Sequence, residues 1–194
     1  PDFHGGYKIA SAKIGDKIIA IGNSGNKINY WTYENQQETF GSIVIPYTTS
    51  TAPVIRKTLT ENYELIIGTT AGTILVYNLE SIITGNSAIK DSLIVEPIYG
   101  ILKISASNSS INAITTSNQN QTEAYFYSDD GTKLRVFNSV PIDLASTIDR
   151  DGNLVSVILS SENIIGVVSN GVFKFGFQPN VNSQLNSISL SDIK

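Results

Sequence analysis

A fourfold pattern constrains the fold of this chain more than any other feature. In each copy an apolar run ends at a glycine turn, and a second apolar run containing a large aromatic residue follows. The turn glycines lie 47, 59 and 40 residues apart, and they are Gly25, Gly72, Gly131 and Gly171. The aromatic residues, each three positions after the first apolar residue of the second run, are Trp31, Tyr77, Phe137 and Phe175. Such self-similarity predicts radial or stacked β repeats.

Strand signals dominate the whole chain. Runs of about five to eight residues rich in β-branched and aromatic side chains alternate with Gly, Asn, Asp and Ser, and no window has a helical period. We therefore predict a single all-β domain over residues 1–194, with repeat units at 7–47, 54–98, 111–148 and 154–193. Residues 81–87 and 98–110 are additional material between the second and third units, and the latter could form a fifth outer strand.

One segment carries a resemblance to a known family. Residues 72–79, GTILVYNL, resemble the end of a WD repeat, in which a tight turn leads into an alternating strand closed by an aromatic and a polar residue. The resemblance implies a propeller-like array of about four four-stranded antiparallel blades, with the four repeated aromatic residues packed between blades. No Trp-Asp dipeptide occurs, and no Gly-His pair precedes the first strand of any unit.

Several arrangements of the four units remain open at this stage. A closed four-bladed ring, a half-propeller that pairs with a second copy, and a fragment of a larger ring all agree with the pattern. A two-sheet β-sandwich is the alternative fold, because it also consists of many short strands with regular turns.

Composition excludes several classes of function. The chain has no cysteine and a single histidine, which removes thiolate metal sites and cysteine nucleophiles and leaves no Ser-His-Asp constellation unless His4 serves. With 13 basic and 17 acidic residues the net charge is −4, so a nucleic acid is not expected as a partner. No run approaches the roughly 20 apolar residues of a membrane span, and we expect no membrane insertion.

The low charge also bears on location. Only 15% of the residues are charged, against about a quarter in an average soluble domain, so the polar surface must consist largely of Asn, Ser, Thr, Gln and Tyr. These side chains do not titrate near neutral pH. We therefore favour an extracellular, virion or cell-surface setting over a cytoplasmic one.

Two acidic turns are the only motifs with possible metal or acid chemistry. Residues 149–153, DRDGN, resemble the start of a calcium loop, but Ser160 stands where the final bidentate acid would be needed. Asp129 and Asp130 precede Gly131 in a position that three other copies occupy without acids. We interpret both segments as hairpin turns and predict no catalytic residue, no metal site and no cofactor.

Aromatic side chains are the remaining candidates for binding. Strand alternation places Tyr30 on the face opposite Trp31 and Tyr33, so one of these faces is expected to be core, and we expect Trp31 to belong to it. Tyr33, Tyr47 and Tyr99, the last in the 98–110 insertion, are the predicted contact residues for a partner or ligand, because flat rings give a large contact area at low entropic cost.

The sequence therefore predicts a non-enzymatic structural or adaptor protein. Its rigid β scaffold would bind other protein subunits, and a second copy of the chain is one candidate among them. A carbohydrate-binding module that stacks sugars on Tyr30, Tyr33 or Tyr47 is the alternative. A hydrolase that uses carboxylates such as Asp129 or Asp149 is the third hypothesis.

Overall fold

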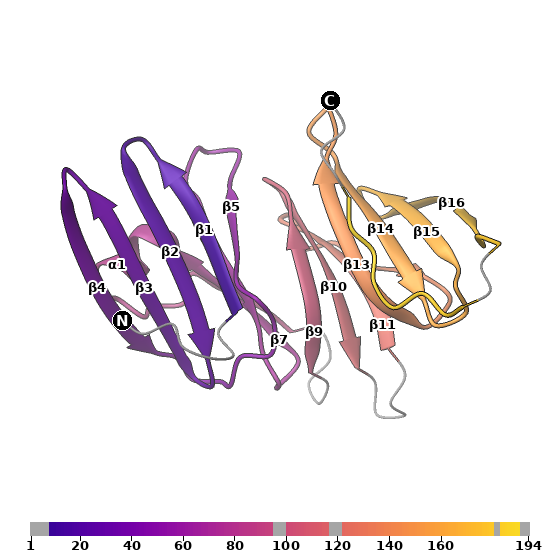
Figure 1. Ribbon diagram of the computed structural model, residues 1–194, viewed down its shortest axis with the longest axis horizontal. Coiled ribbons are helices and arrows are strands. Elements are labelled where there is room, and N and C mark those ends of the chain that lie inside the picture. Colours follow the sequence, from indigo (N-terminus) through magenta and orange to yellow (C-terminus); the bar gives the residue numbers. More distant parts are fainter. Residues whose placement is uncertain (1–7, 95–99, 117–121, 181–182, 191–194) are drawn as a thin grey trace. The chain divides into compact units, whose positions relative to one another are not determined.

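The computed structural model describes residues 8–94, 100–116, 122–180 and 183–190, which consist mainly of strands and turns (Figure 1). Contacts between residues divide the chain into two compact units, Pro1–Ile101 and Leu102–Lys194. The described residues form four separate four-stranded antiparallel sheets. This confirms the predicted all-β, propeller-like array, and a two-sheet sandwich is not formed. That the chain is a single domain stays a prediction.

In the first unit, strands that are adjacent in sequence are also adjacent in each sheet. Sheet 1 contains β1 (Lys8–Ile14), β2 (Lys17–Ser24), β3 (Lys27–Glu34) and β4 (Gln37–Val44). Sheet 2 contains β5 (Val54–Lys57), β6 (Tyr63–Gly68), β7 (Thr73–Asn78) and β8 (Asp91–Ile94). A short helix, α1 (Leu79–Ile83), follows β7, and Asn78 caps it by accepting a hydrogen bond from the Ser81 backbone N–H at 3.1 Å. The strands of both sheets fall within the predicted units 7–47 and 54–98.

In the second unit the strands are grouped differently from our prediction. Sheet 3 contains β9 (Ile101–Ala106), β10 (Ser110–Thr116), β11 (Thr122–Ser128) and β12 (Lys133–Phe137). Sheet 4 contains β13 (Pro141–Ile148), β14 (Leu154–Ser160), β15 (Ile165–Ser169) and β16 (Val172–Phe177).

The predicted units 111–148 and 154–193 are therefore wrong by one strand. The segment 98–110, interpreted above as an insertion, supplies β9. Strand β9 precedes β10 in the sequence and forms backbone hydrogen bonds with the edge of β10 that would otherwise have no partner strand. Residues 141–148 consequently begin sheet 4 instead of ending sheet 3. Residues 185–190, expected as a last strand, are not in a strand.

The core of the first unit lies between sheets 1 and 2, and α1 packs beside β3, β6 and β7. Its buried members are Ile19, Ile21, Ile28, Tyr30, Ile43, Ile45, Leu65, Ile67, Leu75, Tyr77, Leu79, Ile82 and Ile83. Burial raises the pKa of Tyr77 to about 12, and its hydroxyl has no hydrogen-bond partner. Tyr77 therefore contributes to this core mainly as a large apolar side chain.

The core of the second unit lies between sheets 3 and 4 and is built around Phe137. This side chain clusters with Ile158 and Val168 of sheet 4, and its ring lies 6.3 Å from that of Phe173. A Cβ atom at position 166 would lie 2.3 Å from the Phe137 ring. Gly166 therefore allows the ring to pack directly on the backbone of β15.

The four repeated aromatic residues do not occupy equivalent places. Tyr77 and Phe137 are buried in the cores, as predicted, but Phe175 is 56% exposed and Trp31 is only partly buried. In the first unit the buried ring is that of Tyr30, which is 7% exposed. The prediction was wrong for Trp31 because strand side chains alternate with a period of two, so Ile28 and Trp31 point to opposite faces.

Gly171 offers a test of the second core. Its φ of +76° lies in the left-handed region, and an added Cβ would lie 2.5 Å from Cδ1 of Phe126. Gly131→Ala is the matched control, since Gly131 has a φ of +90° but no atom within 4 Å of an added Cβ. We expect Gly131→Ala to cost about 1–2 kcal/mol from backbone strain, and Gly171→Ala to cost about 1–3 kcal/mol more from overpacking.

Urea unfolding of the two variants measures this difference through the transition midpoint at constant slope. Equal losses in both variants would show that Phe126 yields without cost, and would contradict the tight packing at this turn.

Candidate protein-interaction surface

Sheet 1 has one face in the core and one face that is exposed. We call the second one the outward face of sheet 1. Strand pairing places on it the apolar residues Ile9, Ile18, Ala20, Trp31, Tyr33, Phe40 and Val44. Ile9, Phe40 and Val44 are 52%, 49% and 59% exposed, although each side chain is apolar.

The strand pairing orders this face into rows that cross the sheet. One central row contains Ser11, Ala20, Trp31 and Phe40, and the next contains Ile9, Gly22, Asn29 and Ser42. The charged residues Lys13, Glu38 and Lys27 pair only into the two end rows. The two central rows are therefore uncharged and contain the large side chains of Trp31, Phe40 and Ile9, and a centre without charge inside a charged rim is the usual composition of a protein-protein interface.

Tyr33 lies on this face beside Trp31. The two rings are 6.2 Å apart between centroids and nearly parallel, with 13° between their planes. Tyr33 is 36% exposed, so part of its ring is open to solvent. The predicted contact residue Tyr33 thus belongs to an aromatic pair on the outward face of sheet 1.

Tyr47 is exposed as well, at 41%, but it lies at the other end of the sheet. Ile45 and Thr49 donate backbone hydrogen bonds to the β2–β3 turn, whereas Tyr33 stands six residues along β3 from the Lys27 that follows that turn. At about 3.3 Å per residue this corresponds to about 20 Å. The structure does not bring Tyr33 and Tyr47 together, and Tyr99 lies outside the described residues.

The two acidic turns hold their carboxylates within the turn itself. Asp149 accepts hydrogen bonds from the backbone N–H groups of Asp151 and Asn153 at 3.0 and 2.9 Å, and from the Asn153 side chain at 3.0 Å. These bonds, the Asn153 side chain first, hold the pKa of Asp149 below its ordinary value. Hydrogen bonds from Ser128 and Thr132 lower the pKa of Asp130 in the same way.

These contacts agree with the interpretation of both segments as turns. In the part of the chain that the structure describes, no group of three or more His, Cys, Asp or Glu residues could hold a metal ion.

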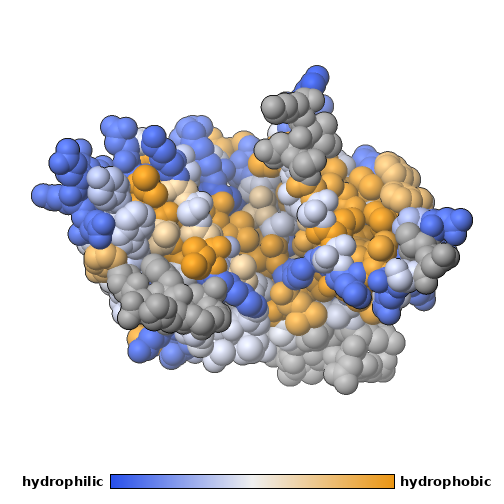
Figure 2. Space-filling model, in the orientation of Figure 1, coloured by the Kyte–Doolittle hydropathy of each residue, from blue (hydrophilic) through white to orange (hydrophobic). Residues whose placement is uncertain are grey.

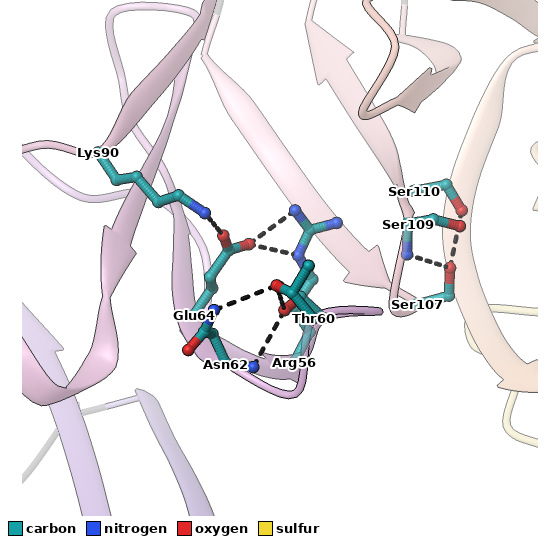
Figure 3. A network of polar contacts seen from close by, with 9 residues as sticks. Arg56, Thr60, Asn62, Glu64, Lys90, Ser107, Ser109 and Ser110 are labelled. Atoms are coloured by element: carbon teal, nitrogen blue, oxygen red, sulfur yellow. Dashed lines mark hydrogen bonds and ion pairs between the residues drawn. The ribbon is translucent and has the colours of Figure 1, made fainter.

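A buried ion cluster in sheet 2 escaped the sequence analysis (Figure 3). Arg56 of β5 lies opposite Glu64 of β6. The Nε atom of Arg56 donates a hydrogen bond to Glu64 Oε2 at 2.7 Å, and Nη2 of the same guanidinium also lies 2.7 Å from Oε2. Lys90 contacts Oε1 of Glu64. The side chains of Arg56 and Glu64 are only 6% and 2% exposed, so this cluster is part of the scaffold and not an accessible site.

The net effect of these contacts is to keep Glu64 ionised. Burial by itself opposes the charge, but the hydrogen bonds from Lys90 and Arg56 outweigh it and hold the pKa of Glu64 below its ordinary value. The sequence signal for this pair is weak: Arg56 follows the apolar Val54 and Ile55, and Glu64 precedes the apolar run 65–67, but that the two residues face each other depends on the register between the strands.

A second polar network links sheets 3 and 4 inside the second unit. The Ser146 hydroxyl lies 2.7 Å from that of Ser105 and 2.6 Å from that of Ser156, and the Asn112 side chain donates to Ser156. Asp143 pairs with Lys103 and accepts backbone hydrogen bonds from Leu144 and Ile188 at 2.8 Å each. The Ser and Asn side chains of this network are uncharged and the charge of Asp143 is paired with that of Lys103, so we interpret the network as part of the scaffold.

Comparisons with known proteins show which solved structures have a similar fold. No protein-family model matches the chain, and no curated protein matches it in sequence. A chain in the structure of a humanized mutant of the Chaetomium thermophilum Polycomb Repressive Complex 2 bound to the inhibitor GSK126 is similar, with a TM-score of 0.65 and 11% identity over 95% of this chain and 45% of that chain.

Two further structures are similar at comparable levels. The WD40 β-propeller domain of Doa1 has a TM-score of 0.60 and 12% identity, over 92% of this chain and 61% of that chain. A structure of BBS1N in complex with ARL6DN has a TM-score of 0.66 and 12% identity, over 96% of this chain and 59% of that chain. At these identities the likeness concerns the fold alone.

The fold of this chain is that of a WD-repeat-like β-propeller array, as the sequence resemblance implied. The chain spans between 45% and 61% of the length of the three structures compared. Among the described residues, no helix is long and apolar enough to cross a membrane.

Proposed function

We propose that this chain is a non-enzymatic scaffold that binds other protein chains through the outward face of sheet 1. The observation that carries this proposal is the uncharged centre of that face, where the apolar side chain of Phe40 pairs with Trp31 and remains 49% exposed. An antiparallel sheet with one solvated face normally alternates apolar and polar side chains. A contiguous exposed apolar patch instead marks an interaction site.

The structural neighbours support an interaction role. They come from a Polycomb Repressive Complex 2 and from a complex of BBS1N with ARL6DN, both of which are protein assemblies. The acidic turns favour a role without catalysis, since Asp149 and Asp130 use their carboxylate oxygens to hold their own loops. The low fraction of charged residues favours an exterior setting, such as a virion or a cell surface.

Site-specific photo-cross-linking tests the proposed surface. We would replace Tyr33 by p-benzoylphenylalanine, which keeps an aromatic side chain, and irradiate the protein in its native source. Leu59, 71% exposed in the β5–β6 connection, is the control position for a large exposed apolar residue away from the face. We expect cross-links to another protein chain from position 33 and none above background from position 59. Equal cross-linking yields at both positions would contradict the proposal.

The affinity for the cross-linked partner gives a second measurement. We expect Tyr33→Ala to weaken binding by about tenfold or more, as for an aromatic interface residue. Raising the salt from 0.1 to 0.5 M should change the affinity by less than about twofold, because the centre of the face has no charge to screen. A steep loss of affinity as the salt concentration rises would show instead that the charged residues at the rim of the face are responsible for binding.

The Trp31–Tyr33 pair favours one alternative ligand. Two nearly parallel, partly exposed rings can also stack on a sugar. Glycan-array binding that Tyr33→Ala abolishes in a folded protein would support a carbohydrate-binding module in place of a protein scaffold.

A further inference from the structure

Residues 183–190, SQLNSISL, follow β16 in the sequence and form neither a strand nor a helix. No residue of this segment is charged. Its apolar residues Leu185, Ile188 and Leu190 are partly buried, whereas its polar residues are exposed. The segment therefore packs against the protein through its apolar side chains and not through strand pairing.

Two side chains of sheet 4 hold the backbone of this segment. Asn163, in the β14–β15 turn, accepts a hydrogen bond from the Leu185 N–H at 2.9 Å and donates one to the Ser183 carbonyl at 3.3 Å. The Asp143 carboxylate of β13 accepts a hydrogen bond from the Ile188 N–H at 2.8 Å. Backbone N–H and C=O groups are present in every chain segment, so these contacts do not require the particular side chains of residues 183–190.

The segment covers one end of a row of side chains on sheet 4. Strand pairing aligns this row across the sheet, and we call it the Leu159 row: Asp143, Leu159, Ile165 and Phe177. Next to Asp143, where the segment is attached, Leu159 is fully buried, whereas Phe177 at the other end of the row is 50% exposed. The row is therefore covered only in part, and its β16 end is open to a further contact.

The views of the molecule agree with this arrangement. Figure 1 shows the segment, in yellow, crossing β13 and β14. Apolar residues gather over β13–β16 in the space-filling view, at the right of Figure 2. The segment is thus seated on a sheet whose exposed surface is largely apolar.

The segment is held less firmly than the strands beneath it. It pairs with none of the strands of sheet 4, and its polar side chains are exposed. Segments with few buried contacts open at a lower free-energy cost than the paired strands of a core. We therefore expect the segment to leave its place while sheet 4 remains folded.

We propose that the Leu159 row is a binding site for an extended segment of another protein chain, and that residues 183–190 occupy it as a tethered ligand of the same chemistry. The incoming segment is uncharged and has two apolar side chains three residues apart, as Leu185 and Ile188 are. Asn163 and Asp143 bind its backbone. The site belongs to the second unit and consists of other residues than the outward face of sheet 1, so it is a second contact of the proposed scaffold.

The chemistry of the site defines this ligand. Asp143 is paired with Lys103, so the only charges at the row already compensate each other. A charged ligand side chain placed on Leu159 or Ile165 would lose its water without gaining a partner, which is costly. A segment longer than the tethered one gains additional area by covering the ring of Phe177.

Binding of a labelled peptide SQLNSISL, measured by fluorescence anisotropy, tests the site. In the wild type the tethered segment competes with the peptide at a local concentration on the order of millimolar. The variant Leu185→Ser/Ile188→Ser weakens the tethered segment and leaves Asn163 and Asp143 in place. We expect this double variant to bind the peptide at least about tenfold more tightly than the wild type does.

A change in the site itself provides the matched control. Asn163 has a φ of +60°, so Asn163→Gly removes its side chain without straining the backbone. Added to the double variant, Asn163→Gly should weaken peptide binding by about tenfold through the loss of two hydrogen bonds. Asn35→Gly makes the same change at a φ of +51° in the β3–β4 turn and should leave the affinity unchanged. Circular dichroism confirms that each variant is folded.

Two measurements on the wild type test whether the segment can be exchanged. We expect the amides of Leu185 and Ile188 to exchange hydrogen at least about 100-fold faster than the amides of β15. Selection from a library of displayed random peptides should enrich uncharged sequences with apolar residues three positions apart, and these should displace the labelled peptide from the double variant.

Each of several results would overturn the inference. These are equal peptide binding by the wild type and the double variant, an Asn163→Gly change without effect, equal amide protection of the segment and β15, and enrichment of charged peptides or of none. Cross-linking from position 33 reports on sheet 1 alone, so the proposed function is tested separately.

Discussion

Replacing Arg56 by methionine is expected to destabilise the first unit by about 3–5 kcal/mol. The substitution removes the guanidinium that contacts Glu64 at 2.7 Å and leaves a carboxylate that is 2% exposed with Lys90 as its remaining cationic partner. Taking a charge out of water is compensated only while its partners are present, so a buried carboxylate that loses one of its two cationic partners is costly. Urea unfolding monitored by circular dichroism measures the loss.

Two further variants define the origin of this loss. The double variant Arg56→Met/Glu64→Leu removes both buried charges and should recover most of the stability, because apolar residues of similar volume replace a buried pair at little cost. Lys57→Ala is the matched control on the same strand, since its pair with Glu61 is exposed and should leave the midpoint nearly unchanged. A double variant as unstable as Arg56→Met would contradict the electrostatic explanation.

The same cluster predicts how stability depends on pH. The pKa of Glu64 is lower in the folded chain than its ordinary value, because the bonds from Lys90 and Arg56 outweigh the effect of burial. Such a carboxyl stabilises the fold fully above its unfolded pKa, near 4.3, and this contribution is lost as the pH falls through the folded pKa. The double variant should therefore lose less stability than the wild type between pH 5 and pH 3.

Phe137→Ala is expected to cost the second unit about 3–5 kcal/mol, whereas Phe175→Ala should cost less than about 1 kcal/mol in the dilute protein. The two residues occupy the same place in the repeat pattern, yet Phe137 is 4% exposed and packs on Gly166 while Phe175 is 56% exposed. Truncating a buried ring leaves a cavity, and truncating an exposed ring does not.

Thermal unfolding of both alanine variants checks this difference, and Phe137→Leu provides a milder core change if the alanine variant does not fold. Equal losses at positions 137 and 175 would restore the sequence interpretation, in which both rings are wedges between sheets.

The number of sheets could be predicted from the sequence, but the faces of their strands could not be predicted throughout. Glycine turns and β-rich runs are local signals, so four units of four strands follow from them directly. The face on which a strand side chain lies follows from the alternation of successive residues between the two faces, and a β-bulge inserts an extra residue that reverses this alternation for the residues after it. In β12 and β16 the strand pairing shifts near Val136 and Lys174, which buries Phe137 and exposes Phe175.

The candidate site was predictable only in part. Tyr33 could be selected because alternation separates it from Tyr30, and the structure places Tyr33 on an exposed face. That Phe40 and Ile18 flank the aromatic pair depends on the register between strands, which a single sequence does not contain. The Arg56–Glu64 pair is similarly a consequence of register, since eight residues and a turn separate the two side chains.

The order of strands within each sheet has a consequence for how the chain acquires its structure. Within the described ranges, each sheet is made of four strands that follow one another in sequence, and none of these strands is exchanged between sheets. Backbone pairing therefore requires only short loop closures, which favours rapid, stepwise formation. During synthesis, each sheet can assemble as soon as its own fourth strand has left the ribosome, without waiting for the carboxyl terminus.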